Sequence, residues 1–316
     1  MKKLKTMTKW QLQPIILAAV LVILMLVFGI VNPVFLTWDA IHSILLNAVP
    51  VAIVAIGMCV AQTAGYFDMA VGMVGTVAGL LCGQVLTDTG NVFLAVIVGL
   101  IFGILAGVVS GFLVSGLHMN AFITTYAMQS IYKGIVFIWT NGFPIRLFGD
   151  EFSSFTKWGS LMVGGIIQFP IIITVVLYVI VFLFMKYRKL GRTIYLVGGN
   201  EDCAHISGIN VKAVQFFVFM LSDFLAAAAG IVFASRVQNA TTAIGETWCM
   251  EAIAAGLMGG TIAGRSNLWN VLMGVIIVYI VKNGLVIVGL SDYYQYIALG
   301  LILFMAVALQ RQKTSR

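Results

Sequence analysis

Charged residues are scarce in this sequence. Lysine, arginine, aspartate and glutamate make up 9% of its 316 residues, whereas 61% are hydrophobic and the mean hydropathy is +1.06. Soluble globular proteins contain about 25% charged residues, so this chain lacks the polar surface that a soluble enzyme, a nucleic-acid-binding protein or a disordered chain needs. The hydrophobic residues form continuous blocks and do not alternate with polar ones, which excludes a transmembrane β-barrel.

Residues that bind metals or form disulfides are also few. The sequence has four cysteines and three histidines, which lie far apart and form neither a C-x-x-C motif nor any spacing typical of metal ligands: Cys59, Cys82, Cys203, Cys249, His42, His118 and His205. This pattern excludes a disulfide scaffold and gives no support to a metal or haem site. We therefore expect no cofactor bound by this chain, and no cluster of acids or histidines marks a catalytic residue.

The apolar blocks predict an all-α membrane protein with about ten transmembrane helices. A spanning helix needs about 20 apolar residues, and ten blocks approach that length: 15–31, 44–64, 70–86, 92–117, 121–139, 161–185, 213–235, 248–263, 268–288 and 293–309. The first block follows a basic segment and lacks a clear signal-peptidase site, so we interpret it as an uncleaved span. We expect a single transmembrane domain over residues 1–316.

The distribution of basic residues predicts the orientation. If the N-terminus lies in the cytoplasm and the spans alternate, most of the 18 lysines and arginines fall on the inner side, and only Arg146, Lys157 and Arg236 fall outside. Positive charge favours the cytoplasmic side of a membrane. Both termini are therefore expected to be cytoplasmic.

Ten spans divide into two halves of five, and an odd number per half would make any internal repeat inverted. In such folds, short or glycine-interrupted spans at corresponding positions indicate the transport pathway. The third and eighth blocks correspond, are short and rich in glycine, and have carboxylates near their starts: Asp68 for the third, Glu246 and Glu251 for the eighth. In the fourth block, glycines at 99, 103, 107 and 111 predict tight helix packing.

Several charged residues fall within or beside the spans, where each costs about 2.5–3.5 kcal/mol at the bilayer centre. They are Asp68, Lys133, Asp223, Glu251 and Lys282. They could be the ion sites of an ion-coupled secondary carrier, or they could pair with one another or reach water. We predict that Asp68 and Glu251, with the amides of Asn120 and Asn283, line a translocation pathway.

A polar loop over residues 186–212 is the longest excursion on the inner side. A turn at 198–199 precedes Asn200, which is a good helix N-cap, and two acidic residues suit the positive end of the helix dipole. Gly208 suits the end of that helix. The loop is therefore predicted to contain a very short helix, which must dock on its own bundle or on a cytosolic partner because two turns are unstable alone.

The same loop carries a resemblance to a known family. Residues 191–211, G-R-T-I-Y-L-V-G-G-N-E-D-C-A-H-I-S-G-I-N-V, closely resemble the coupling-loop signature of permease subunits of ribose-type sugar ABC importers. Further segments are similar to that family's motifs in the same order: 65–72, 120–125, 132–134, 140–145, 250–255, 259–261 and 283–285. The sequence departs from the family at Cys249, where an acid is usual, after 259–261, where the glycine-rich continuation is broken, and before the eighth span, where a proline is missing.

The resemblance implies a permease subunit of an ATP-driven, binding-protein-dependent importer in the inner membrane, which moves a sugar or sugar-like solute by alternating access. It implies three kinds of partner: a second permease subunit, identical or different, cytosolic ATPase subunits, and an external (periplasmic) solute-binding protein. The sequence contains no G-x-x-x-x-G-K-[ST] loop, so ATP and Mg²⁺ are expected on the ATPase. Nucleic acid is not an expected partner.

By the same resemblance, the short helix is expected to contact the ATPase. The residues that would do so are Gly199, Asn200, Glu201, Asp202, Ala204, His205, Ser207 and Gly208. Two other functions stay open from the residues alone: an ion-coupled secondary carrier, and a membrane enzyme such as a lipid-modifying transferase. The enzyme is disfavoured because no cluster of acids or histidines lies at one interface.

Overall fold

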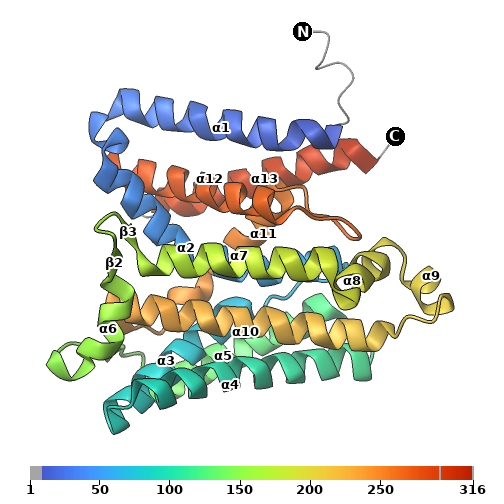
Figure 1. Cartoon of the computed structure of the whole chain (residues 1–316), viewed down its shortest axis with the longest axis horizontal. Coiled ribbons are helices and arrows are strands. Elements are labelled where there is room, and N and C mark those ends of the chain that lie inside the picture. Colours follow the sequence, from blue (N-terminus) through green and yellow to red (C-terminus); the bar gives the residue numbers. More distant parts are fainter. Residues whose placement is uncertain (1–8, 292, 315–316) are drawn as a thin grey trace.

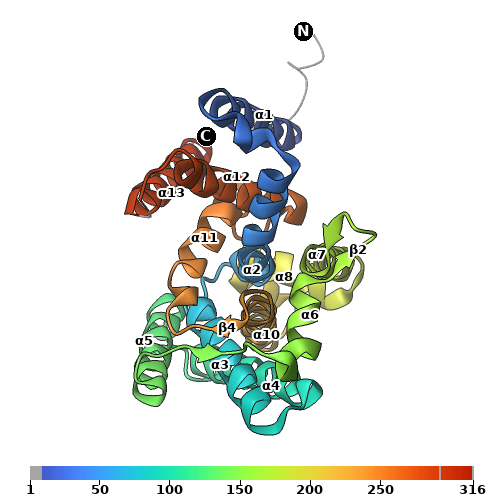
Figure 2. The ribbon, with the colours of Figure 1, turned by 90° about the vertical axis from the view of Figure 1, so that its left-hand side faces the viewer.

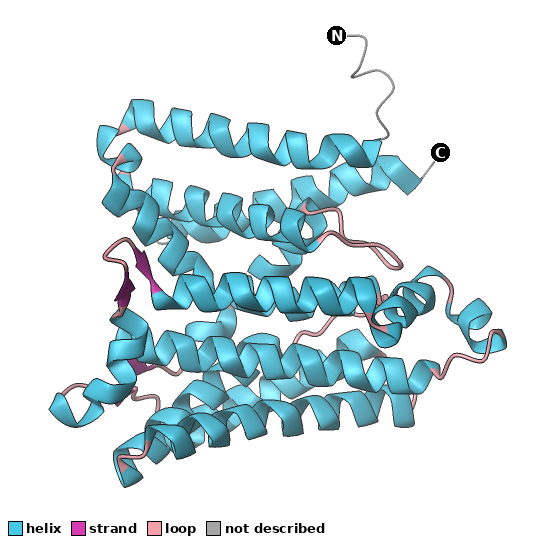
Figure 3. Ribbon diagram, viewed as in Figure 1, coloured by secondary structure: helices cyan, strands magenta, loops and turns pink. Residues whose placement is uncertain are grey.

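A computed structural model describes residues 9–291 and 293–314, and it is built almost entirely from helices (Figures 1 and 3). The α-helices are α1 Lys9–Val31, α2 Trp38–Thr63, α3 Val71–Thr89, α4 Val92–Gly111, α5 Ala121–Thr140, α6 Ser153–Ser160, α7 Phe169–Tyr187, α8 Lys189–Gly199, α9 Glu201–Ile206, α10 Val211–Val237, α11 Trp248–Met258, α12 Leu268–Ile287 and α13 Tyr293–Thr314. The predicted all-α class is confirmed.

Short elements join these helices. β1 Ile145–Arg146 pairs with β4 Asn239–Ala240, and β2 Met162–Val163 pairs with β3 Ile167–Gln168, both antiparallel. Four single-turn helices complete the described chain: η2 Pro33–Leu36, η3 Phe112–Gly116, η4 Asp150–Phe152 and η5 Ile244–Glu246.

Seven of the described helices are long and apolar enough to cross a membrane: α1, α2, α3, α4 with η3, α7, α10 and α12. The long helices lie roughly parallel, and the first and last described residues lie at the same end of the bundle as α8 and α9 (Figure 1). α2 is the central helix: 83% of its apolar window is buried, against 11% for α1, which covers one edge (Figure 2).

Three predicted boundaries were wrong. The block 161–185 does not begin as a helix, because Gly164 and Gly165 take positive φ angles of 65° and 70° and turn the chain into the β2–β3 hairpin before α7. The block 248–263 is helical only as far as Met258. The turn expected at 198–199 is instead the last part of α8.

The glycine stripe of α4 packs directly on the backbone of α10. A Cβ on Gly107 would lie 2.5 Å from Met220 Cα, and one on Gly103 would lie 2.8 Å from the carbonyl oxygen of Asp223. Helices in lipid associate through such close backbone approach, because lipid offers no hydrophobic driving force between them. The prediction of tight packing is confirmed for this helix.

α3 and α11 begin inside the bundle and not at its surface. A non-helical segment precedes α3 and the single turn η5 precedes α11, and the first residues of both helices, among them Gly72 and Trp248, are buried. These interior starts meet where Gly72 touches Gly245 of η5, so closely that a Cβ on Gly72 would overlap the Gly245 carbonyl oxygen. The starts of the short, glycine-rich third and eighth blocks therefore lie against one another in the buried interior.

Candidate functional site

α9 is the short capped helix that the sequence predicts. The Asn200 side chain accepts a hydrogen bond from Cys203 N at 2.8 Å, which satisfies one of the free donors at the helix start. Gly208, at a φ of +79°, follows its last turn. The helix stands out from the end of the bundle where α7 and α10 meet the polar loop (Figure 1).

Glu201 attaches α9 to the bundle. Its Oε2 accepts a hydrogen bond from the Tyr66 hydroxyl at 3.1 Å, and its Oε1 accepts one from Gln215 Nε2 at 3.2 Å. Gln215 Nε2 also donates to the Tyr66 hydroxyl oxygen at 2.5 Å. Burial raises the pKa of Tyr66 to about 12, so the phenol keeps the proton that it donates. The three side chains join α9, α10 and the chain that leads into α3.

The remaining predicted contact residues divide into two groups. Ala204 is buried and faces the bundle. The others are exposed at the end of the molecule: Gly199, Asn200, Asp202, His205, Ser207 and Gly208. Glu201 is exposed too, but its carboxylate is already engaged by Tyr66 and Gln215.

A second polar group lies where α3 begins. Asp68 and Asp223 are both fully buried and their carboxyl groups interact with one another. Asp68 Oδ1 accepts a hydrogen bond from Ala70 N at 3.1 Å, and Asp223 Oδ2 accepts one from Ser110 Oγ at 3.4 Å. Next to them, Met69 N donates to Thr125 Oγ1 at 2.9 Å. This group joins the chain before α3 to α4, α5 and α10.

A third polar group surrounds Glu251 on α11. Its Oε1 lies 2.7 Å from Lys282 Nζ, and its Oε2 accepts a hydrogen bond from the Tyr279 hydroxyl at 2.9 Å. Asn283 belongs to the same network, because its Nδ2 donates to the Tyr279 carbonyl and its Oδ1 accepts from Asn47 Nδ2 at 3.2 Å. Glu251 is 1% exposed, so it contributes to the packed interior.

Pairing was one of the possibilities left open for the five intramembrane charges, and Glu251 does pair with Lys282 at 2.7 Å. Lys133 also forms an ion pair at 2.7 Å, with Glu246, which is not one of the five. The four predicted pathway residues do not form one cluster. Asp68 belongs to the second polar group and Glu251 with Asn283 to the third. Asn120 lies apart from both, exposed at the start of α5, where its side chain caps that helix by accepting a hydrogen bond from Ile123 N at 3.2 Å.

Residues 40–307 match the family described as branched-chain amino acid transport system / permease component. The chain belongs to this permease family. It is 34% identical to the ribose import permease RbsC of Haemophilus influenzae, over 91% of this chain and 90% of that protein. It is also similar to two proteins of Escherichia coli, the L-arabinose transport permease AraH (30%; 93% and 89% covered) and the D-allose transport permease AlsC (29%; 92% and 90% covered).

Family membership and the seven apolar helices make the chain a multi-pass protein of the inner membrane. As a permease component it is a transport protein and not itself an enzyme. The expectations of an ABC permease and of transport are thereby confirmed.

The permease exposes two apolar residues that sequence reasoning missed. Ile206 on α9 is 84% exposed and Leu196 on α8 is 57% exposed, both next to the predicted contact residues. The exposure of Ile206 could have been suspected from the sequence, because a two-turn polar helix has no apolar face on which an isoleucine would be buried. Tyr66 and Gln215 were also missed, and nothing in their local sequence marks them as partners of Glu201.

Proposed function

We propose that this chain is the permease subunit of an ATP-driven, binding-protein-dependent importer for a sugar or sugar-like solute. The relatives are named for ribose, arabinose and allose, which supports a sugar without selecting one. Nothing about these relatives favours the ion-coupled carrier, and Glu251 is already neutralised by Lys282. The partners we propose are a second permease subunit, cytosolic ATPase subunits that carry ATP and Mg²⁺, and a periplasmic binding protein.

We propose ten spans in two inverted halves, with both termini in the cytoplasm, by adding α5, α11 and α13 to the seven apolar helices. Corresponding helix pairs support the repeat. In this division α2, α3, α4 and α5 of the first half correspond to α10, α11, α12 and α13 of the second. Equivalent pairs are then in contact: α2–α12 and α10–α4, α2–α11 and α10–α3, and α11–α13 and α3–α5. The two interior starts of α3 and α11 are then equivalent positions of the two halves.

Coupling to the ATPase is proposed to run through the polar loop 186–212 of this single transmembrane domain. The observation that carries this proposal is the position of α9: exposed on its outer side, and fastened on its inner side by Glu201 to Tyr66 and Gln215. An ATPase that displaces α9 would pull on the chain that leads through Asp68 into α3. Because α3 touches η5 at Gly72, that displacement would reach the second half as well, as alternating access requires.

The contact with the ATPase is tested by Ile206→Asp. Placing a carboxylate on the outer side of α9 should abolish copurification of the ATPase subunit with the solubilised permease. Ile206→Val and Lys189→Gln, the second of which changes an exposed residue of the neighbouring α8, should retain it. Full copurification with Ile206→Asp would place the contact elsewhere.

The orientation is tested with a natural reporter. Cys203 on α9 is exposed, whereas Cys59, Cys82 and Cys249 are buried. A membrane-impermeant maleimide should therefore label the permease in inverted membrane vesicles but not in intact spheroplasts, and Cys203→Ser should abolish the labelling. Labelling in spheroplasts would put α9 outside the cell and would contradict the proposed coupling.

A further inference from the structure

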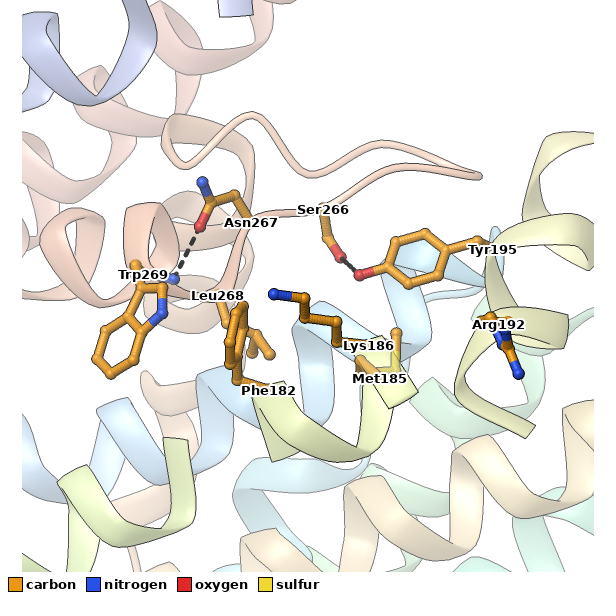
Figure 4. A pocket seen from close by; sticks show the side chains of 9 residues that line it. All are labelled: Phe182, Met185, Lys186, Arg192, Tyr195, Ser266, Asn267, Leu268 and Trp269. Atoms are coloured by element: carbon orange, nitrogen blue, oxygen red, sulfur yellow. Dashed lines mark hydrogen bonds between the residues drawn. The ribbon is translucent and has the colours of Figure 1, made fainter. Parts of the chain in front are cut away.

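A pocket of about 420 Å³ opens beside the loop end of α7, between α7–α8 and the start of α12. Its aromatic wall is formed by Phe182 and Trp269, whose ring centroids lie 6.1 Å apart. On the opposite side, Ser266 Oγ and the Tyr195 hydroxyl are 3.2 Å apart and hydrogen-bonded (Figure 4). The pocket therefore has an apolar side and a polar side, and none of the residue roles assigned above uses it.

The charge of this pocket is positive. Lys186 and Arg192 are the charged residues among the nine that line it, and no acidic residue is among those nine. Within the part of the chain that the structure describes, neither forms a salt bridge. Lys186 Nζ lies 5.6 Å from the centroid of the Phe182 ring, and the side chain extends toward Asn267 and Trp269 (Figure 4). An ammonium group thus stands at the boundary between the aromatic and the polar sides.

An apolar surface leads away from the pocket along α7. Val176, Ile180 and Leu183 follow one another at helical spacing on one face, and they are 48%, 54% and 45% exposed. α7 lies on the opposite side of the bundle from α5 and α13 (Figure 2). In a multi-pass membrane protein such a face is available to acyl chains, and a tryptophan near the start of a span is typical of the headgroup region.

We propose that this pocket binds an anionic phospholipid of the cytoplasmic leaflet. The phosphate would bind Lys186, with Arg192 contributing charge from the α8 side. The glycerol and headgroup hydroxyls would bind the polar side at Ser266 and Asn267, and an acyl chain would lie along α7. Basic pockets between transmembrane helices on the cytoplasmic side are suited to such headgroups. The choice of leaflet rests on the orientation proposed above, whereas the choice of ligand rests on the charge and shape of the pocket.

The bound lipid would also be placed to affect coupling. One wall of the pocket is α7–α8, which leads directly into α9, and the other is the start of α12, which packs on α2 and α11. A headgroup between them would hold these two walls at a fixed separation. Anionic lipid is therefore expected to stiffen the junction between the polar loop and the bundle.

The test measures lipid binding to the whole purified permease in detergent by native mass spectrometry. The probes are phosphatidylglycerol and phosphatidylcholine with identical acyl chains, and inorganic phosphate as a competitor. The unaltered protein should prefer phosphatidylglycerol. Lys186→Gln should reduce that preference about fivefold, which corresponds to about 1 kcal/mol for one lysine near the membrane surface. Lys186→Arg should retain the preference, and so should Lys189→Gln, a neighbouring lysine that does not line the pocket.

Three outcomes would overturn the proposal. An equal loss in Lys186→Gln and Lys189→Gln would mean that the preference is general surface charge. Displacement of phosphatidylglycerol by millimolar inorganic phosphate would identify a site for free anions and not for lipid. Loss of lipid binding when the ATPase subunit is present would identify the pocket as part of that protein contact. Because this assay involves no transport, its result is independent of whether the chain carries a sugar.

Discussion

At the scale of single residues, the buried carboxylate of Glu251 depends on Lys282 and Tyr279. Removing the lysine by Lys282→Met leaves an unpaired buried charge, which costs about 3–5 kcal/mol in comparable pairs. We therefore expect a large fall in the thermal unfolding temperature of the purified permease, measured in detergent. Lys282 is only 22% exposed and Glu251 is 1% exposed, so solvent relieves little of this cost.

The control for that prediction is the double substitution Glu251→Met with Lys282→Met. Replacing both partners by apolar groups removes the unpaired charge, so the double variant should be more stable than Lys282→Met alone. If the single variant and the double variant lose the same stability, the loss does not come from leaving Glu251 without its partner.

Tyr66 gives a second prediction at this scale, because its hydroxyl fastens Glu201 of α9. Tyr66→Phe removes a hydrogen bond to a charged group, which is worth about 1.5–3 kcal/mol. Amide hydrogen exchange in α9 should speed up roughly tenfold or more, while the ATPase still copurifies and solute uptake falls. Tyr126→Phe, an exposed tyrosine on α5, should leave the exchange of α9 unchanged, and unchanged exchange in Tyr66→Phe would show that α9 is held by other contacts.

At the scale of elements, the packing of α4 on α10 gives a matched pair of glycines. Gly107→Ala would place a methyl group 2.5 Å from Met220 Cα, whereas Gly134→Ala on α5 would meet nothing within 4 Å. Overpacking of this kind costs about 1–3 kcal/mol. We expect Gly107→Ala to lower the unfolding temperature and Gly134→Ala to leave it unchanged. Equal stability of the two variants would mean that α4 and α10 are not in close contact in the membrane.

The elements also show what sequence patterns can and cannot predict. The start and end of α9 could be predicted because Asn200 and Gly208 affect only residues close to them in the sequence. The β2–β3 hairpin was not predicted, because residues 161–168 are apolar enough to continue a span and only Gly164 and Gly165 mark the turn. The seven apolar helices follow from composition alone, whereas the interior start of α11 depends on α3, far away in the sequence.

At the scale of the whole molecule, the candidate site could be predicted only in part. The exposed side of α9 follows from the local resemblance, and the possibility that intramembrane charges pair follows from their cost in lipid. Which charges pair could not be predicted, because Glu251 meets Lys282 only through the packing of α11 on α12. Helix packing also places Asn120 away from the other predicted pathway residues. Long-range contacts decide these positions, and no local periodicity encodes them.

The two halves of the chain also meet at the end opposite α9, and this contact gives a prediction for the whole molecule. Ile145 of β1 is paired with Ala240 of β4, so cysteines introduced by Ile145→Cys and Ala240→Cys lie within the Cα separation that a disulfide requires. Oxidation should cross-link them, shift the electrophoretic mobility and block solute uptake while the ATPase still copurifies. Reduction should restore uptake. Ile145→Cys with Ser291→Cys, which are not paired, should not cross-link.

The contact between Gly72 and Gly245 has a consequence for biosynthesis. α3 is synthesised long before α10 and η5, yet it is against these later elements that its glycine face packs. During synthesis, the inner surface of the first half therefore stays uncovered in the membrane until the helices of the second half are inserted. Truncated chains that stop before α10 are accordingly expected to be degraded by membrane proteases, because the face of α3 that packs on α10 and η5 stays uncovered in them.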